Sequence, residues 1–268
     1  MVVRKNQRNL NSDEQMNFLL AWQSLNSQGP LAMFVSLHSF SAYLLHSGNT
    51  PPDWGSWRFL PWHRSYLYQL EQALHASGGL WPDIGIPYWD WSNKVDQAIP
   101  QWLQNITESV GNIVVTRNPG VGARTLPPPE DVVKLNQINT YLEFTQCLEM
   151  GNGCDAGQGF RSAMHNQVHQ WVGGTMNLGE TAPADIIFWM HHANVDRIWS
   201  DWQKQHPNEY PNGLGCKLDP KAACDNLKIP GHEGNAYVLD PFKKQVNPDI
   251  YYIEPDCRSI QQLGYSYV

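Results

Sequence analysis

The segment ADIIFWMHHANVDRIWSDWQK (residues 184–204) decides the fold. Its apolar residues recur at helical spacing along the whole stretch, which predicts one long helix. The adjacent histidines His191 and His192 lie within its most apolar part, IIFWMHH. Burying several imidazoles without partners is costly, and a bound metal ion removes that cost. The helix therefore predicts a buried histidine site.

A second histidine pair precedes this helix. The segment HNQVH places His165 and His169 four residues apart, so both imidazoles lie on one face of a helix, one turn apart. Adjacent helical residues point about 100° apart, so only one of His191 and His192 faces the same ion easily. We assign His192 as the third ligand and expect His191 to make a supporting hydrogen bond.

The neighbours of His192 favour it over His191 as the third ligand. Phe188 stands four residues before it and Asp196 four residues after it, where a ring or a carboxylate supports a ligating histidine. Three histidines without a carboxylate fit copper, or zinc with an open position. One such site alone is compatible with a zinc hydrolase, whereas two favour a copper pair.

Further histidines lie upstream, in two segments that are also predicted to be helical. His38 belongs to a predicted helix over residues 30–46, and His63 to the first turn of another over residues 61–76. On a straight helix His38 and His46 would lie about 12 Å apart. If both bind one ion, the first helix must end or bend between them. We interpret the other histidines as ordinary surface or structural residues: His75, His206 and His232.

The rest of the chain predicts a mainly α fold with long irregular loops and little β structure, in a single domain over residues 1–268. The high content of Trp, 12 residues, favours a large aromatic core. Residues 111–130, rich in Gly and Pro, are expected to form a long loop. Bundle interiors commonly hold metal sites built from facing helices. The expected helices span residues 11–26 (capped by Ser12), 30–46, 61–76, 130–146, 159–172 and 184–204.

Composition limits the possible partners and locations. The net charge is −7 and the charges are mixed, which argues against a nucleic-acid partner. No run reaches the roughly 20 apolar residues of a membrane helix. The polar N-terminus lacks a signal-peptide pattern, so we expect a cytoplasmic protein or one exported by another route. Two disulfides are compatible with the cysteine spacing, Cys147 with Cys154 and Cys216 with Cys224.

Four segments resemble signatures of the tyrosinase and polyphenol oxidase family, the type 3 copper proteins, in the expected order. They are FLPWHRSYL (59–67), PYWDW (87–91), HNQVHQWVGG (165–174) and FWMHHANVDRIW (188–199). VRKN near residue 3 and LGYSY (263–267) resemble the opening and closing segments. The resemblance covers nearly the whole chain and implies a bare catalytic domain of bacterial type, without the C-terminal shielding domain of many members.

The resemblance implies a four-helix bundle in which each of two copper ions takes three histidines. The second set carries over as His165, His169 and His192. In the first set His38 and His63 match, but the middle ligand, nine residues before the last, is replaced by Trp54. We expect His46 to substitute; the alternatives are a copper held by two histidines or an altered site.

The resemblance also implies copper-dependent oxidation of phenols and o-diphenols by O2 to o-quinones, as in tyrosinase or catechol oxidase. Asn166 is the expected catalytic residue, orienting a water, although only Gln158 stands near the place of the usual glutamate. Ala182 takes the place of a bulky gate residue and predicts an open entrance. A copper-delivery protein is a possible partner. The alternatives are a hemocyanin-like oxygen carrier and an o-aminophenol oxidase.

Overall fold

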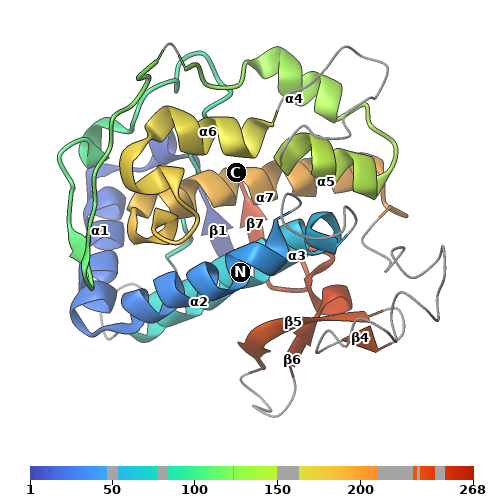
Figure 1. Cartoon of the computed structure of the whole chain (residues 1–268), viewed down its shortest axis with the longest axis horizontal. Coiled ribbons are helices and arrows are strands. Elements are labelled where there is room, and N and C mark those ends of the chain that lie inside the picture. Colours follow the sequence, from blue (N-terminus) through green and yellow to red (C-terminus); the bar gives the residue numbers. More distant parts are fainter. Residues whose placement is uncertain are drawn as a thin grey trace.

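Four helices of the computed structural model carry most of the histidines predicted to bind metal, and Figure 1 shows how these helices are arranged. They are α2 (Pro30–Leu45), α3 (Trp54–Ala76), α6 (Met164–Val172) and α7 (Ile186–Gln205). Helix α3 packs against α2 and α7, and α6 packs against α7. The structure describes residues 1–46, 54–77, 84–122, 124–149, 163–209, 232–233, 236–244 and 251–268. The predicted mainly α fold with a four-helix bundle is confirmed.

Side chains fix the starts of the first and last helices. Helix α1 (Ser12–Ser27) begins with a capping box, in which Asn11 and Glu14 each accept a hydrogen bond from the other's backbone N–H. The predicted cap, Ser12, is therefore wrong by one residue. Helix α7 begins at the Asp185 cap, whose carboxylate accepts from the N–H of Ile187 at 2.9 Å. The long helix predicted over residues 184–204 is confirmed.

Helix α3 begins seven residues earlier than predicted. Pro61 lies inside the helix rather than in its first turn, and His63 consequently lies in its third turn. A proline inside a helix removes one backbone hydrogen bond. Phe59 and Leu60, which precede it, are buried in the core, and their burial offsets that loss.

The region before α6 differs from the prediction in two places. Helix α4 (Pro129–Leu135) and helix α5 (Tyr141–Glu149) replace the single helix expected over residues 130–146. The expected loop over residues 111–130 contains strand β3 (Ile113–Val114), which pairs with β2 (Ser109–Val110) across Gly111. Gly111 has φ +57°, which a glycine adopts without strain. Within the predicted helix 159–172, residues 159–162 lie outside the described residues.

The two ends of the chain lie side by side. Strand β1 (Val2–Arg4) pairs in parallel with strand β7 (Tyr265–Tyr267). A separate antiparallel sheet is formed by β4 (His232–Glu233), β5 (Ala236–Lys243) and β6 (Tyr251–Ile253). Within the described residues the remaining structure is short 3-10 turns and loops.

A buried ionic network ties these ends to α3 and α7. Asp196 of α7 accepts hydrogen bonds from Arg64 at 2.5 Å, Arg4 at 3.1 Å and the hydroxyls of Tyr265 and Tyr267, both at 2.6 Å. Burial alone would raise the pKa of Asp196, but Arg64 and Arg4 hold that pKa below its usual value. The network joins the helices that carry His63 and His192.

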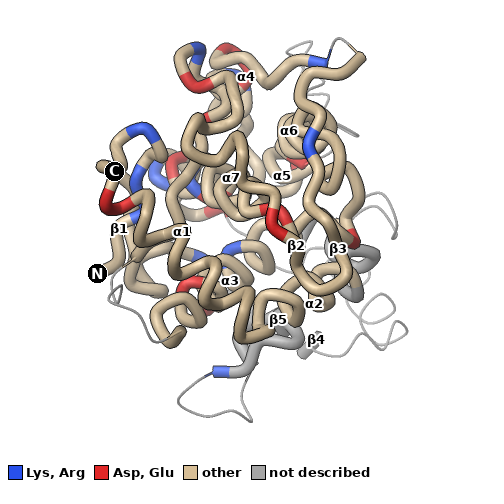
Figure 2. The backbone as a smooth tube through the Cα atoms, turned by 90° about the vertical axis from the view of Figure 1, so that its left-hand side faces the viewer, with Lys and Arg blue, Asp and Glu red and all other residues tan. Residues whose placement is uncertain are grey.

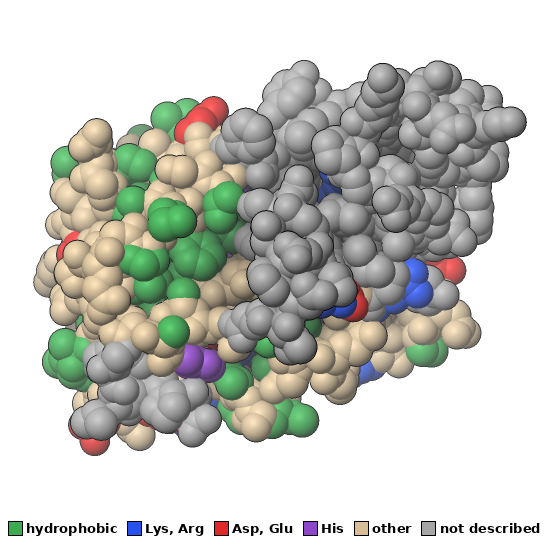
Figure 3. All heavy atoms as spheres, turned by 90° about the horizontal axis from the view of Figure 1, so that it is seen from below, with side chains coloured by type: hydrophobic (Ala, Val, Ile, Leu, Met, Phe, Trp, Pro, Cys, Tyr) green, Lys and Arg blue, Asp and Glu red, His purple; other side chains and the backbone are tan. Residues whose placement is uncertain are grey.

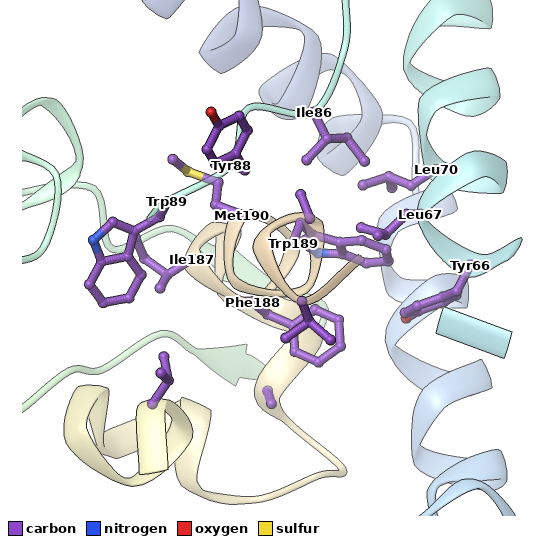
Figure 4. Packing of buried hydrophobic residues seen from close by; sticks show 14 of the residues in the cluster. Tyr66, Leu67, Leu70, Ile86, Tyr88, Trp89, Ile187, Phe188, Trp189 and Met190 are labelled. Carbon is purple, nitrogen blue, oxygen red and sulfur yellow. The ribbon is translucent and has the colours of Figure 1, made fainter. Parts of the chain in front are cut away.

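An aromatic core fills the space between the helices (Figure 4). The ring of Trp189 on α7 packs against Tyr66 on α3 at 4.5 Å between centroids, with Leu67 and Leu70 beside it. Phe34 meets the same Trp189 ring edge-on at 5.8 Å. The aromatic core expected from composition is confirmed by the fully buried tryptophans, which are Trp22, Trp62, Trp89, Trp91, Trp189, Trp199 and Trp202.

The structure also bears on three smaller expectations, which concern membrane spans, charge distribution and disulfides. None of the described helices is long and apolar enough to cross a membrane. Acidic and basic residues are interspersed along the described chain (Figure 2). Cys147 is disulfide-bonded and the buried Cys257 is in no disulfide, so the partner of Cys147 lies outside the described residues. The predicted pairings themselves involve Cys154, Cys216 and Cys224, which are not described.

Candidate metal centre

The first cluster is built by α2 and α3. His38 on α2 and His63 on α3 bring their Nε2 atoms to 3.4 Å from each other. His46 contributes a third ring, with its centroid 5.6 Å from that of His38 and 5.4 Å from that of His63. One donor atom of each of the three residues lies within 4.8 Å of the others.

The place of His46 follows from the end of its helix. Helix α2 ends at Leu45, and His46 is its C-cap with an extended backbone, φ −114° and ψ 140°. The expected separation of about 12 Å holds only for a continuous helix. Because the helix ends first, the ring of His46 turns back toward His38.

The second cluster is built by α6 and α7. The Nε2 atom of His165 lies 3.1 Å from that of His169 and 3.3 Å from that of His192. His165 and His192 are buried and His169 is half-buried. The three histidines predicted as one set are thus brought together at their Nε2 atoms.

His191 departs from its expected role. Among the described residues neither of its ring nitrogens has a hydrogen-bond partner, so the predicted supporting hydrogen bond is not found. Its ring instead stacks on His165 at 5.2 Å, and one of its nitrogens belongs to the second group of possible metal donors. Adjacent helical residues point about 100° apart, yet the rings of both His191 and His192 lie near that of His165, at 5.2 and 4.9 Å between centroids.

The expected support of His192 is half correct. The ring of Phe188 packs on His192 with centroids 4.2 Å apart. Asp196 does not bond to His192, which corrects the second expectation. Its carboxylate is already occupied by two arginines and two tyrosines, as described above.

The two clusters face each other across the bundle. The rings of His63 and His192 stack with centroids 4.4 Å apart and planes 11° from parallel. Phe59 closes one side of the site, 4.8 Å from the rings of both His63 and His165. Phe188 lies 5.1 Å from His38. Both phenylalanines are fully buried, so apolar rings exclude water from the space between the clusters.

Backbone carbonyls fix the orientation of three imidazoles. The Nδ1–H groups of His38, His63 and His169 donate to carbonyl oxygens at 2.7 Å each. The acceptors are Gly179, Phe59 and Met176. A neutral imidazole that donates from Nδ1 carries its lone pair on Nε2. The three Nε2 atoms are therefore acceptors that face other nitrogens.

Burial keeps these imidazoles neutral. It is the largest cause of the shift at each of them, and neighbouring histidines add to it at several. The pKa falls to about 4 at His169. The pKa lies well below its usual value at His38, His63, His165, His191 and His192.

The donor set fits a metal ion. Histidine nitrogens about 2.0–2.1 Å from one tetrahedral ion lie about 3.3 Å apart, which matches the Nε2 separations of 3.1, 3.3 and 3.4 Å. Facing lone pairs repel one another unless a cation lies between them. All-imidazole donors without a carboxylate suit copper or zinc.

Other predicted residues have mixed outcomes. Asn166 follows His165 in α6 and is half-buried. Trp54 is the first residue of α3, and its side chain lies outside the described part of the chain, as does Gln158. Ala182 is fully buried in a 3-10 turn, so the structure does not place it at a surface opening.

Figure 3 shows a histidine that reaches the surface beside hydrophobic side chains, on one face of the molecule.

Comparisons with known proteins identify the arrangement. The common central domain of tyrosinase matches residues 31–125 and 108–205. The chain belongs to the tyrosinase family. It is 31% identical to a tyrosinase of Streptomyces glaucescens in an alignment of 244 positions that covers 77% of this chain and 84% of that protein. The family places the chain among the type 3 copper oxidoreductases, which use two copper ions.

Hemocyanins are also similar to this chain. Units G and H of a Sepia officinalis hemocyanin are 30% identical in an alignment of 267 positions that covers 92% of this chain and 44% of that protein. A functional unit of octopus hemocyanin shares the fold with a TM-score of 0.69 and 22% identity, over 100% of this chain and 68% of that one. A tyrosinase of Burkholderia thailandensis also shares the fold, with a TM-score of 0.67 and 21% identity. That match covers 100% of this chain and 73% of the other.

Sequence reasoning missed one feature of the site. Phe59 contacts rings of both clusters, but it lies outside the helix that the sequence predicts over residues 61–76. Its spacing held the signal, because Phe59 stands four residues before His63 and shares its helical face once α3 is extended to Trp54.

Proposed function

We propose that six histidines hold the two copper ions. His38, His46 and His63 hold the first, and His165, His169 and His192 hold the second. The observation that carries this proposal is the approach of neutral Nε2 atoms to within 3.1–3.4 Å of one another in a buried space. The parallel rings of His63 and His192 support placing the two ions next to each other.

With both ions bound, the site oxidises phenols and o-diphenols to o-quinones with O2, and the metal pair supplies the redox chemistry. The chain's own part is placement. The carbonyls of Gly179, Phe59 and Met176 hold the Nδ1–H groups of three ligands, so that their Nε2 lone pairs point inward.

The surrounding residues control water and protons. Phe59 and Phe188 exclude bulk water from the space between the clusters. Asn166 follows a proposed ligand in α6 and is half-buried, so its amide can orient a water that accepts the proton of the phenol hydroxyl. The proton leaves with that water before the aromatic ring is oxidised.

The test combines metal content with turnover. Copper-loaded protein is assayed for O2 uptake with a monophenol and with its o-diphenol. We expect about two coppers per chain and consumption of the o-diphenol, and uptake with the monophenol identifies a tyrosinase. An Asn166→Ala variant should keep both coppers and lose monophenol activity more than o-diphenol activity. About one zinc and no copper per chain would overturn the proposal in favour of a hydrolytic site.

An oxygen carrier is the second candidate, because hemocyanins resemble nearly the whole chain. A carrier shares the histidine centre but does not turn over substrate. Reversible O2 binding without consumption of excess catechol would favour this function. Consumption of an o-aminophenol in preference to catechol would instead assign an aminophenol oxidase.

Two further proposals concern the whole chain. Residues 1–268 form a single catalytic domain, which the pairing of β1 with β7 supports because it joins the two ends. Copper is supplied by a delivery protein, which the burial of most of the histidines supports. If free Cu(I) loads the apoprotein as fast as a copper-carrying protein does, the delivery partner is unnecessary.

A further inference from the structure

His191 is a fully buried histidine for which the proposed copper ligation has no role. Neither of its ring nitrogens has a hydrogen-bond partner among the described residues. An unsatisfied buried polar group is costly, and native structures contain few of them. Its presence therefore calls for a partner that the protein atoms do not supply.

The rings around His191 are those of the second cluster. Its centroid lies 5.0 Å from His169, 5.0 Å from His192 and 5.2 Å from His165, and the last pair is stacked at 19°. Trp91 borders the ring at 5.8 Å. The first cluster has no such neighbour among the described residues, since its group of possible donors contains three histidines and the second contains four.

The donor atoms of these four residues lie close together. One nitrogen of His191 and one of each of the other three lie within 4.8 Å of one another. The Nε2 atom of His165 lies 3.1 Å from that of His169 and 3.3 Å from that of His192, and a nitrogen of His191 lies within 4.8 Å of a donor atom of each. The carbonyl of Met176 holds the His169 ring at 2.7 Å, whereas neither ring nitrogen of His191 makes a hydrogen bond of normal geometry among the described residues.

We infer that His191 is a fourth copper-binding histidine of the second cluster, which retains the ion when one of the three converging histidines is lost. In that exchange one copper–nitrogen bond breaks and a bond to a ring nitrogen of His191 forms. Both imidazoles are neutral, so no proton or electron is transferred. The inference rests on the proposed ligation of the second copper by His165, His169 and His192.

The experiment measures copper affinity and stoichiometry in the full chain, with and without His191. His191→Phe keeps an aromatic ring against Trp91 and should still bind two coppers. His169→Ala should retain the second copper, weakened by no more than about 100-fold. The double variant should lose at least a further tenfold in affinity, because the removed groups act on one ion.

The matched control removes a histidine outside the clusters. His75 bonds through Nε2 to the carbonyl of Ile84 at 2.7 Å, so His75→Phe combined with His169→Ala should bind copper as His169→Ala alone does. If His191→Phe fails to fold, judged by circular dichroism of the apoprotein, His191→Gln takes its place.

Pulsed electron paramagnetic resonance of the Cu(II)-loaded second site gives an independent readout, because it counts coordinated imidazoles. His169→Ala should show three imidazoles and the double variant two. Equal copper loss and two imidazoles in both would overturn the inference. Wild-type protein that binds fewer than two coppers would instead overturn the proposed function, so the two failures are distinct.

Discussion

The two histidine clusters are built in different ways. The first takes one donor from a helix end, since His46 follows the last residue of α2, and two of its rings are held by backbone carbonyls. The second takes its donors from within two helices, has one ring held by a carbonyl and has a fourth histidine beside it. The first therefore depends on fixed orientation, and the second on a surplus of donors.

The largest expected effect comes from removing a histidine of the first cluster, which has only three possible donors among the described residues. His63→Ala should remove the first copper and lower kcat by roughly 1000-fold, because a dinuclear reaction needs both ions. Metal analysis and O2 uptake measure the two effects. His75→Ala serves as the control and should keep two coppers. If His63→Ala retained both coppers, the first cluster would have a spare donor, and the proposed difference between the clusters would be wrong.

The next effect concerns the buried Asp196 network, which joins the helices α3 and α7 of the two clusters. Asp196→Ala should lower the free energy of unfolding by about 3–5 kcal/mol, because it removes the carboxylate partner of the buried Arg64 guanidinium and one of the two carboxylates that pair with Arg4. Urea denaturation measures the change. Both clusters should lose copper together, since the network joins α3 to α7.

The matched control is Asp201→Ala on the same helix. Asp201 pairs at the surface with Lys204 and Arg197, so its loss should cost less than about 1 kcal/mol. Equal losses in the two variants would show that the buried network adds no more stability than a surface pair.

A smaller effect should be confined to the second cluster. Gly174 has φ +53°, and an added Cβ would lie 2.1 Å from the carbonyl oxygen of Thr116. Gly174→Ala should displace the turn that presents the carbonyl of Met176 to His169, and weaken the second copper by about 10- to 100-fold. Copper titration measures this.

Gly29→Ala is the control for backbone strain alone, because Gly29 has φ +97° but no described atom within 4 Å of an added Cβ. It should lower stability by about 1 kcal/mol and leave copper binding unchanged. Weakening of the first copper rather than the second by Gly174→Ala would contradict the assigned anchor.

The smallest effect lies outside both clusters. Burial raises the pKa of Asp96 to about 6, and one of its carboxylate oxygens has no described partner. Because the folded-state pKa exceeds the unfolded value, the folded protein holds its proton more tightly. Stability should therefore fall as pH rises from about 4 to about 6.

Asp96→Asn should remove that pH dependence and gain about 1–2 kcal/mol over the wild type at pH 7.5, with little difference near pH 4. Melting temperatures across this range measure it, and copper binding should not change. A gain that is the same at both pH values would contradict ionisation of Asp96 as the cause.

The sequence predicted the second cluster better than the first for physical reasons. Spacing within a helix fixes direction, so HNQVH alone indicates that His165 and His169 converge. The approach of His46 to His38 depends on where α2 ends, which apolar periodicity does not define. The resemblance indicates Trp54 at the position of the middle ligand, but sequence spacing carries no geometric information about which histidine would replace that ligand.

Tertiary contacts explain the other misses. Asp196 has helical spacing suited to His192, but its partners Arg4, Tyr265 and Tyr267 come from the chain ends and take its oxygens. Pro61 signals a helix start locally, whereas packing of Phe59 extends the helix beyond it. Local patterns thus predicted most of the helices but joined α4 and α5 into one, while long-range packing determined helix limits and side-chain partners.

The central claim is that each cluster holds one copper ion. Anomalous diffraction from crystals of copper-loaded protein, recorded on both sides of the copper absorption edge, tests it directly. We expect two peaks, one among the Nε2 atoms of His38 and His63 with His46 beside it, and one among those of His165, His169 and His192. A single peak at the second cluster, or a signal at the zinc edge alone, would contradict the account.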